Sequence, residues 1–329
     1  MSVAQEIRAV RESAGLFRRE DRGVLEVSGG DRARWLQGML SADIEALAPG
    51  PEASGCAALL LNHRAGVIAE MHVALRPEAF WLECHRASLP EVRERLEKFI
   101  VADDVELADR SLAFDLLGLE GPRAGAILAR AAGSGIEALA PGAVGSVVLG
   151  DVDAVVGRWG ITGESGFRLF VSAGDGGRAA EALEAHAGDD SLVAAGATAL
   201  ETLRIEAGVP AMGSELDEDV LPDEARMGGA VSDSKGCYTG QEIIARLRSR
   251  GRVNHLLVGL RLEGSGEGLE RGAEIRDDQR ALGEVTSLCQ SPDEGWIALG
   301  FVRRQASEPG TEVQVAECRA RVVSLPFHS

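Results

Sequence analysis

The sequence predicts an α+β protein, in which a mixed body of helices and strands is followed by a small all-β domain. The chain has 329 residues, 45% of them hydrophobic and 26% charged, which is the composition of a folded protein of about two domains. Up to residue 250, helical and strand-like patterns alternate. Beyond Gly251 only short strand patterns follow, separated by turn signals, as in a barrel. We therefore divide the chain into a body, 1–250, and a C-terminal β-barrel, 251–329.

The first part of the body is expected to contain helices, two of them with N-terminal capping signals, and a group of strands. Asp31 is the expected N-cap of a helix that follows a strand and a glycine turn within 23–40. Ser88 and Glu91 have the spacing of a capping box at the start of another helix. Gly66 marks the turn between two strands. The expected elements are helices over 2–14 and 88–100 and strands over 56–62, 67–75 and 79–85.

The second part of the body repeats this mixture before its pattern is lost. Gly208 is the expected stop of a long helix. Residues 209–231 show no period and contain two prolines and a cluster of acids, so they form either a linker or a functional loop. The expected elements are strands over 112–121, 146–159 and 166–172 and helices over 122–133, 177–188 and 193–208. The barrel strands are expected at 255–262, 272–276, 281–288, 295–302, 311–315 and 320–325.

The charge of the chain argues against nucleic acid as its main partner. The net charge is −18 and the isoelectric point is about 4.8, so the surface repels phosphate backbones at long range. One basic stretch, RLRSRGR at 246–252, stands out. It is a solvated face, a contact for an acidic partner or a site for an anionic ligand tail, and the sequence does not choose among these.

The cysteines and the N-terminus exclude further classes. The five cysteines form no CxxC pair and no Cys/His cluster with zinc spacing, so we expect neither a disulfide framework nor a structural metal site. The N-terminus is charged and lacks the apolar segment of a secretion signal, and no apolar run approaches ~18 residues. The expectation is a cytoplasmic protein without a membrane partner.

The stretch KGCYTGQE, residues 235–242, concentrates unusual residues. It contains Cys237, Tyr238, which is the only tyrosine, and Lys235, one of two lysines. Thr239 and Glu242 have capping-box spacing, which places Cys237 just before a helix N-terminus. A helix N-terminus and nearby bases favour the thiolate, so we expect Cys237 to be a partly exposed, reactive thiol.

A plainer interpretation exists for each of these residues. Cys237 could behave as a small buried apolar residue, Glu242 could be only a helix cap and Tyr238 could simply pack. His255, the only histidine nearby in the sequence, opens a strand and offers little support for Cys–His hydrolysis.

The same stretch resembles the signature of the YgfZ family of folate-binding proteins, which belongs to the superfamily of the aminomethyltransferase called T-protein. Further segments carry the resemblance, so that it covers most of residues 20–305. They are DRARWLQGMLSADI at 31–44, LLLNHRAGVIAEMHV at 59–73, GLEGPRA at 118–124 and TLRIEAGVPAMGSELDEDVLPDEA at 202–225.

This resemblance implies a fold, a ligand and a role. It implies two interwoven α+β domains that, with a C-terminal β-barrel, surround a central cavity for tetrahydrofolate. It places the pterin-binding carboxylate at Glu206, in the R-x-E-x-G segment, where a carboxylate can accept two adjacent N–H groups of the pterin edge. From the residues alone, a salt bridge between Glu206 and Arg204 is the simpler interpretation.

One departure from the T-protein pattern bears on activity. The paired aspartates that follow the glycine turn in the T-protein align with Ala69 and Glu70. Loss of the catalytic aspartate argues against aminomethyl transfer unless Glu70 reaches the cavity.

Three hypotheses follow. The first is a tetrahydrofolate-binding accessory protein that supports synthesis or repair of iron–sulfur enzymes through transient contact with client or assembly proteins. Its site would be Cys237 with Lys235, Tyr238, Gln241 and Glu242. The second is a folate-dependent aminomethyl or one-carbon transferase, and whether the protein turns over a substrate stays open. The third is a redox-sensing Cys237 without folate binding.

Overall fold

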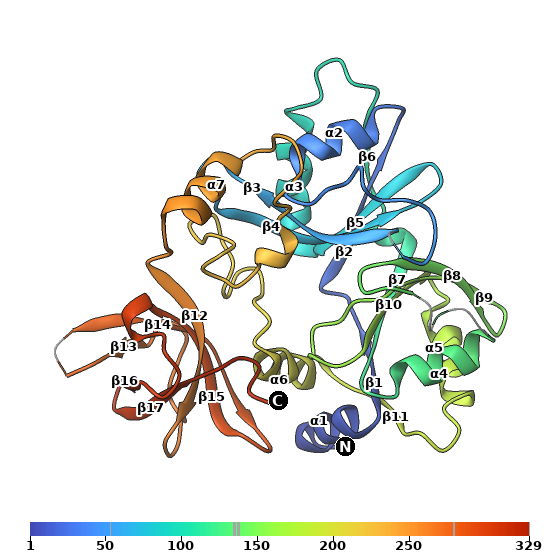
Figure 1. Cartoon of the computed structure of the whole chain (residues 1–329). Helices are drawn as coiled ribbons and strands as arrows, with labels where there is room; N and C mark the ends of the chain where they lie inside the picture. Colours follow the sequence, from blue (N-terminus) through green and yellow to red (C-terminus); the bar gives the residue numbers. More distant parts are fainter. Residues whose placement is uncertain (53, 134–135, 137–138, 279, 329) are drawn as a thin grey trace.

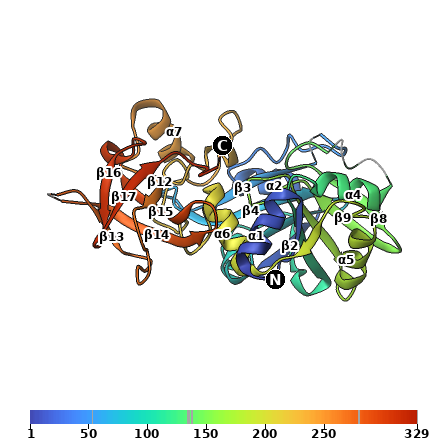
Figure 2. The same ribbon diagram turned by 90° about the horizontal axis from the view of Figure 1, so that it is seen from below.

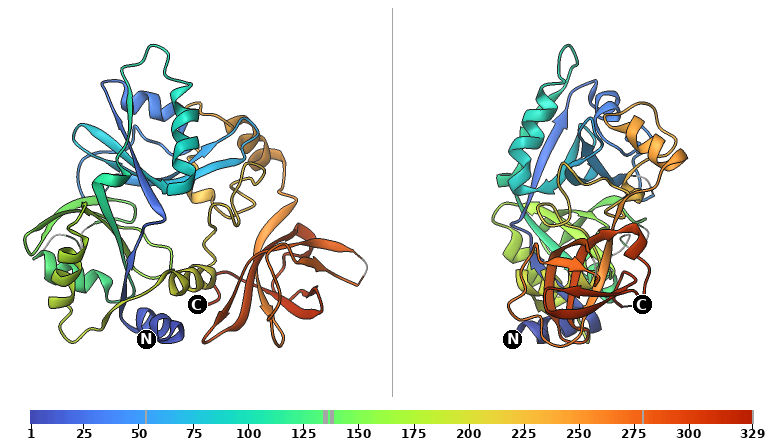
Figure 3. Two further views of the ribbon diagram at one scale, coloured as in Figure 1. Left: turned by 180° about the vertical axis from the view of Figure 1, so that it is seen from behind. Right: turned by 90° about the vertical axis from the view of Figure 1, so that its left-hand side faces the viewer.

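The protein is built from two β-sheets and a barrel. The computed structural model describes residues 1–328 except 53, 134–135, 137–138 and 279. Figure 1 shows the two sheets and the barrel at the corners of a triangle, with α6 (Ala197–Ala207) and the segment 209–231 between them. Figure 3 shows that this triangle is flat, because the side view is much narrower than the view from behind.

The six-stranded sheet has the order β11-β1-β7-β10-β9-β8 and is antiparallel except where β1 pairs with β11. Helices α4 and α5 pack on it around a core that includes Ile127, Leu128 and Leu183. Its elements are β1 (Ala14–Arg18), β7 (Phe114–Glu120), α4 (Ala124–Ala132), β8 (Val144–Leu149), β9 (Val152–Gly157), β10 (Gly166–Ser172), α5 (Gly176–Ala185) and β11 (Leu192–Ala194).

The five-stranded sheet has the order β3-β4-β5-β2-β6 and is entirely antiparallel. Helices α2 and α3 cover it with Leu36, Val92 and Leu96. Its elements are β2 (Arg22–Ser28), α2 (Arg32–Met39), β3 (Gly55–Leu61), β4 (Val67–Leu75), β5 (Ala79–His85), α3 (Leu89–Glu97) and β6 (Glu106–Asp109).

The chain order makes the two sheets interwoven, as expected. Strand β1 belongs to the six-stranded sheet, β2 to β6 form the five-stranded sheet, and the chain then returns to the first sheet at β7. The faces of the two sheets meet through a cluster that includes Val24, Trp81, Trp159 and Phe170. This crossing places the β1–β2 connection at the border of both sheets.

The C-terminal part is a closed six-stranded barrel, which confirms the expected fold class. Its strand order is β12-β15-β14-β13-β16-β17, and β12 pairs with β17 to close it. Figure 2 shows α6 between the barrel and α1 (Val3–Glu12). The strands are β12 (His255–Leu262), β13 (Glu274–Arg276), β14 (Ala281–Ser291), β15 (Gly295–Arg303), β16 (Glu312–Val315) and β17 (Cys318–Val323).

Several expected helix ends are wrong. The first helix stops at Glu12, and the residues after it form β1, a short strand that local pattern did not reveal. The helix expected over 193–208 begins only at Ala197, since β11 precedes it, although Gly208 ends it in the left-handed conformation as expected. Strand β6 was also missed.

Asp31 and Ser88 stand at the N-cap positions of α2 and α3 as expected, but neither side chain caps its helix, and the third predicted cap is at the wrong residue. The side chain of Asp31 accepts the backbone N–H of Asp104 at 2.9 Å and caps nothing in α2. Ser88 is helical itself and makes no side-chain cap. Helix α7 (Gln241–Arg250) has Gly240 at its N-cap, with a φ of 84°, so the Thr239–Glu242 capping box is wrong.

The segment 209–231 is packed onto the body and is therefore not a loose linker. It carries a short 3₁₀ helix, η4 (Gly228–Ala230), and its apolar residues join a core with Leu59, Leu61 and Tyr238. A Cβ at Gly66 would lie 1.8 Å from the carbonyl oxygen of Glu218, so only glycine lets the turn between β3 and β4 approach this segment.

Candidate functional site

A cavity of about 810 Å³ opens where β1, β4 and α6 meet, and we call it the β1–α6 cavity. Its apolar wall includes Leu16, Phe17, Ile161 and Leu200, and its charged residues come from the β1–β2 connection, β4 and α6. The size and the mixture of apolar surface with a few polar groups are typical of a small-molecule site. The charged lining residues are Arg18, Arg19, Glu20, Asp21, Arg22, Glu70, Glu201 and Arg204, with His85 at the end of β5.

Glu70 reaches this cavity. Strand β4 alternates its side chains, so Ala69 is fully buried in the core while Glu70 points the other way and stays 16% exposed. Arg22 donates to both carboxylate oxygens, from Nη1 to Oε1 and from Nη2 to Oε2 at 3.2 Å. A bidentate guanidinium fixes the plane of the carboxylate, so Glu70 presents a held, partly open acceptor to the cavity.

Behind Glu70 lies a buried charge network that joins the two sheets. Glu83, 1% exposed, pairs with Nε of Arg22 at 2.9 Å and with Nε of Arg168 at 3.1 Å. Its second oxygen accepts Nε1–H of Trp159 at 2.8 Å. Burial alone would raise the pKa of Glu83, but Arg168 and Arg22 hold it well below its usual range.

Two further arginines shape the wall. Arg19 is 4% exposed, and its Nη1 has no hydrogen-bond partner in the described part of the chain. Arg204 is held by Glu215 at 2.8 Å and by the hydroxyl of Ser287 at 2.6 Å, while its Nε donates to Glu201 at 2.9 Å. A buried guanidinium N–H without a partner beside a cavity is suited to an acceptor atom of a ligand.

Glu206 lies elsewhere on α6. It is 1% exposed, and its Oε2 accepts Nη2 of Arg11 at 2.9 Å and lies 3.4 Å from Nε2 of His328. The salt bridge expected with Arg204 is wrong, because Arg204 pairs with Glu201 and Glu215. Glu206 is not among the described residues that line the β1–α6 cavity. Its assignment as a pterin anchor stays a prediction.

The side chain of Lys235 is directed at the C-terminal end of α2. Its Nζ donates to the carbonyl oxygens of Gln37 at 2.6 Å, Leu40 at 2.5 Å and Ala42 at 2.8 Å, which lie at the C-terminal end of α2. Nζ also lies 4.9 Å from the ring centre of Tyr238. Burial lowers the pKa of Lys235 to about 8, against the opposing effect of Asp43. The three donors of an ammonium group are thus used to hold the end of a helix.

The other residues of the motif are spread around α7. Cys237 is exposed and is a free thiol, but it lies outside the helix and is not among the described residues of the cavity wall. Tyr238 is buried among apolar residues, and this burial raises its pKa. Gln241 is the first residue of α7, and Glu242 is exposed and pairs with Arg246 at 3.2 Å. The structure therefore brings the Lys235 ammonium to the Tyr238 ring, while the exposed side chains of Cys237 and Glu242 lie outside the cavity wall.

Arg22 and Glu83 were missed in the sequence. Glu83 had a usable signal, because a single acid in the middle of the apolar strand AFWLECH must either face solvent or be paired. Arg22 and Arg168 had none, since their partners lie on other strands far away in the chain.

Comparison with known proteins shows which family has this architecture. The model of the GCVT N-terminal domain matches residues 1–235, and the model of the glycine cleavage T-protein C-terminal barrel domain matches 256–328. The chain is a member of the glycine-cleavage T-protein family.

Relatives within the T-protein family cover nearly the whole chain. The aminomethyltransferase of Bacillus subtilis is 31% identical over 99% of this chain and 91% of its own length, and that of Geobacillus kaustophilus is 32% identical over 99% and 90%. The crystal structure of glycine cleavage system aminomethyltransferase T from Bartonella henselae superimposes with a TM-score of 0.85 at 27% identity, over 99% of this chain and 89% of that one. The T-protein fold, with its interwoven sheets and barrel, is therefore shown for this chain.

Within the described ranges, no three His, Cys, Asp or Glu side chains come together in a way that could hold a metal ion. No helix in the described part of the chain is both long and apolar enough to cross a lipid bilayer.

Proposed function

We propose that this protein binds tetrahydrofolate in the β1–α6 cavity and acts as a folate-dependent one-carbon transferase. The observation that carries the proposal is Glu70, which is held by Arg22 at the wall of the cavity. It supplies a carboxylate where the T-protein pattern of paired aspartates is lost. The relatives named aminomethyltransferase support the same class of reaction.

The cavity fits a reduced folate in chemistry as well as in size. A pterin edge offers adjacent N–H donors, and the fixed carboxylate of Glu70 can accept two of them or bind the reacting amine. Leu16, Phe17 and Leu200 provide apolar contact for an aromatic ring. Arg18, which is exposed at the cavity wall, suits the carboxylates of the glutamate tail.

The protein's own residues act by orientation and by charge. Bound tetrahydrofolate supplies the ring nitrogen that accepts the one-carbon unit. Glu70 is the acceptor for a proton or an N–H group at that place, and Arg22 fixes the plane of its carboxylate. Glu83, which is itself paired with Arg168, holds Arg22 from behind, so the clamp is set before any ligand arrives.

Binding is tested by anaerobic calorimetric titration of tetrahydrofolate into the wild type and into Glu70→Gln, Glu206→Ala and Glu94→Gln. We expect saturable binding that weakens at least ~10-fold in Glu70→Gln, since a charge-assisted pair is lost. Glu94 is a matched control, because among the described residues its one ion pair is with Lys98 on the surface. Weakening in Glu206→Ala would support Glu206 as the pterin anchor. Absence of binding to the wild type would overturn the proposal.

Turnover is tested separately. We expect tetrahydrofolate-dependent release of ammonia from an aminomethyl-lipoyl donor by the wild type and a loss of at least ~100-fold in Glu70→Gln. Folate binding without any turnover at high protein concentration would exclude the transferase.

A second function is favoured by one observation on the surface. KGCYTGQE presents Cys237 as the one cysteine of the five that is exposed. This is the arrangement expected for an accessory protein of YgfZ type, whose thiol would contact iron–sulfur client or assembly proteins transiently. Cys237→Ala would then lower the activity of iron–sulfur enzymes in a strain carrying only this variant, with folate affinity unchanged. Cys318→Ala is the control, because Cys318 is half-buried on the barrel. Normal activity of those enzymes in the Cys237→Ala strain would exclude the accessory role.

A further inference from the structure

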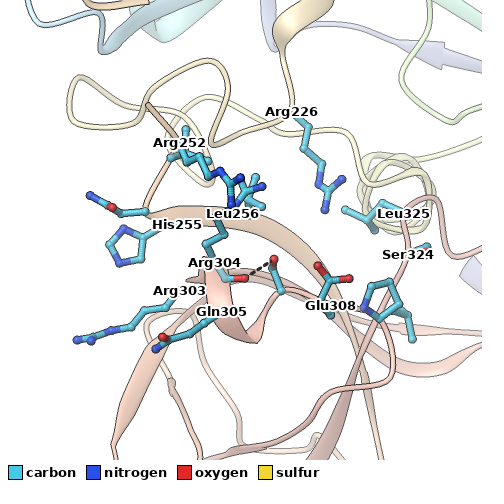
Figure 4. A pocket seen from close by; sticks show the side chains of 15 residues that line it. Arg226, Arg252, His255, Leu256, Arg303, Arg304, Gln305, Glu308, Ser324 and Leu325 are labelled. Carbon is cyan, nitrogen blue, oxygen red and sulfur yellow. Dashed lines mark hydrogen bonds between the residues drawn. The ribbon is translucent and has the colours of Figure 1, made fainter. Parts of the chain in front are cut away.

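A second cavity lies on the barrel, away from the β1–α6 cavity. It has a volume of about 1110 Å³ and is lined by the start of β12, the end of β15, the turn η5 (Arg304–Ala306), the end of β17 and Arg226 of the segment 209–231. Figure 4 shows Arg226 on the segment above the opening and Arg303, Arg304 and Glu308 on the barrel side below it. We call this cavity the arginine pocket.

The fold brings four arginines to this pocket from three separate places. Strands β12 and β15 pair so that His255 lies opposite Arg303, and the backbone N–H of Arg304 donates to the carbonyl of Asn254 at 2.8 Å. These contacts set Arg252, just before β12, beside the end of β15. Arg226 has a φ of 61° and is anchored by its Nε, which donates to the carbonyl of Leu257 at 2.6 Å.

The charge of this pocket is not neutralised from within. Among the described residues, no carboxylate forms an ion pair with Arg226, Arg252, Arg303 or Arg304, and Glu308 is the only acid in the described lining. Arg248 of the same basic stretch behaves differently, since it pairs with Asp223 and Asp233. In a chain with 52 acids and 34 bases, four arginines without acid partners around one cavity form a site for an external anion.

The shape and lining narrow the class of anion. The pocket is too large for a single phosphate or carboxylate, so an occupant must carry several charges along a chain. No Phe, Tyr or Trp occurs in the described lining, which argues against single-stranded nucleic acid, whose bases stack on aromatic side chains. Val253, Leu256 and Leu325 supply apolar contact between the charges. Guanidinium groups match carboxylates in a planar, two-bond geometry.

We propose that the arginine pocket binds an acidic peptide segment of a partner protein. The rest of the surface repels such a partner, because the net charge of the chain is −18. Within a Debye length of ~8 Å, however, the four arginines dominate the electrostatic potential. An acidic peptide is therefore repelled by the rest of the surface and attracted to this pocket, which defines one docking site and orientation. This proposal does not depend on folate binding.

The test is fluorescence anisotropy of a labelled peptide in which glutamate alternates with leucine, titrated with the full-length protein. The test variant is the triple substitution Arg252→Gln, Arg303→Gln and Arg304→Gln. Arg226 is left intact because it holds the backbone of Leu257. The control variants are Arg319→Gln, an exposed arginine of β17 outside the pocket, and Arg246→Gln, which lies in the basic stretch but outside the pocket.

We expect saturable binding at low salt that weakens at least ~10-fold in the triple variant, and less than ~2-fold in either control. A peptide with glutamine in place of glutamate should not bind, and the affinity for the acidic peptide should fall as salt rises to about 0.5 M.

Three outcomes would overturn the proposal. The first is no binding of the acidic peptide to the wild type at low salt. The second is equal affinity of the triple variant and the controls. The third is binding through these arginines of tetrahydrofolate with an oligo-γ-glutamate tail, or of an oligonucleotide, in preference to the peptide, which would assign the pocket to a ligand tail or to nucleic acid.

Discussion

The ring of His72 stacks on the indole of Trp159, with ring centres 4.7 Å apart and planes 3° apart. Its Nδ1 has no hydrogen-bond partner within the described residues. Burial lowers the pKa of His72 to about 4, although Glu83 and Glu70 act in the opposite direction. The imidazole is therefore held neutral beside the charge network, where a second cation would compete with Arg22 for the carboxylates.

This pKa shift predicts part of the loss of unfolding free energy at acidic pH. The unfolded chain binds a proton at His72 near pH 6.5 and the folded protein only near pH 4, so the contribution is present above pH 6.5 and is lost as the pH falls to about 4. Relative to His72→Phe, which keeps the stack, the wild type should lose about 3 kcal/mol of unfolding free energy between pH 7 and pH 4. Urea denaturation at each pH measures this. His63→Phe, at an exposed position, should follow the wild type, and parallel pH profiles for wild type and His72→Phe would contradict the assignment.

The sequence was least informative about the contacts of single side chains. The sequence drew attention to Lys235, but it did not show that its Nζ turns to Gln37, Leu40 and Ala42, almost two hundred positions away. The sequence left open whether Glu70 reaches a cavity, and in the structure its alternation with Ala69 along β4 places it at the wall of the β1–α6 cavity. Partners across sheets are set by tertiary packing, which local pattern does not contain.

Helix α2 shows how one element depends on a distant side chain. Its C-terminal carbonyls receive Lys235 and no glycine cap, since Leu40 at the C-cap is extended. An ammonium group at this end satisfies free carbonyl groups and complements the helix dipole.

Removal of this cation should loosen α2. Lys235→Met leaves buried carbonyl oxygens without donors, and we expect a loss of about 1–3 kcal/mol in unfolding free energy. Faster amide exchange confined to residues 32–44 should accompany it. Lys98→Met is the matched control, because this other lysine is exposed and its one ion pair within the described part of the chain is with Glu94. Unchanged exchange in α2 of Lys235→Met would mean that the carbonyls find other donors.

Elements were predicted well in their centres and poorly at their ends. The alternation of apolar residues identified β3, β4, β5 and all six barrel strands. Capping boxes failed at Ser88 and Thr239 because a turn or a left-handed glycine set the helix start first. Strands β1, β6 and β11 are short, and their pairing with other strands, more than their own composition, makes them strands.

At the scale of the molecule, Glu83 connects the two sheets. It lies on β5 of the five-stranded sheet, and it binds Arg168 of β10 and Trp159 near the end of β9 in the other sheet. The two interwoven sheets are thus also linked by a buried ion pair, to which each sheet contributes one residue.

Neutralising Glu83 should weaken the joint between the sheets. Glu83→Gln leaves Arg168 buried without a full counter-charge, and we expect a loss of about 3–5 kcal/mol of unfolding free energy. Chemical denaturation followed by tryptophan fluorescence measures it. Glu26→Gln is the control, since Glu26 binds Trp81 and Arg110 in the same manner but near solvent. Similar losses in the two variants would show that burial of the pair is not decisive.

The overall architecture was only partly a property of local pattern. The change to strands alone after Gly251 predicted the barrel, and closure between β12 and β17 confirms it. The return of the chain to the six-stranded sheet at β7 followed only from family resemblance, since β1 pairs with residues about a hundred positions later.

The segment 209–231 borders both cavities: Val209 to Met212 line the β1–α6 cavity, and Arg226 lines the arginine pocket. A ligand in either place that favours one position of this shared wall changes the free energy of filling the other. Thermodynamic reciprocity makes the two effects equal: the factor by which a bound small molecule changes the affinity for the partner is the factor by which the bound partner changes the affinity for the small molecule. Either affinity therefore measures the same coupling free energy.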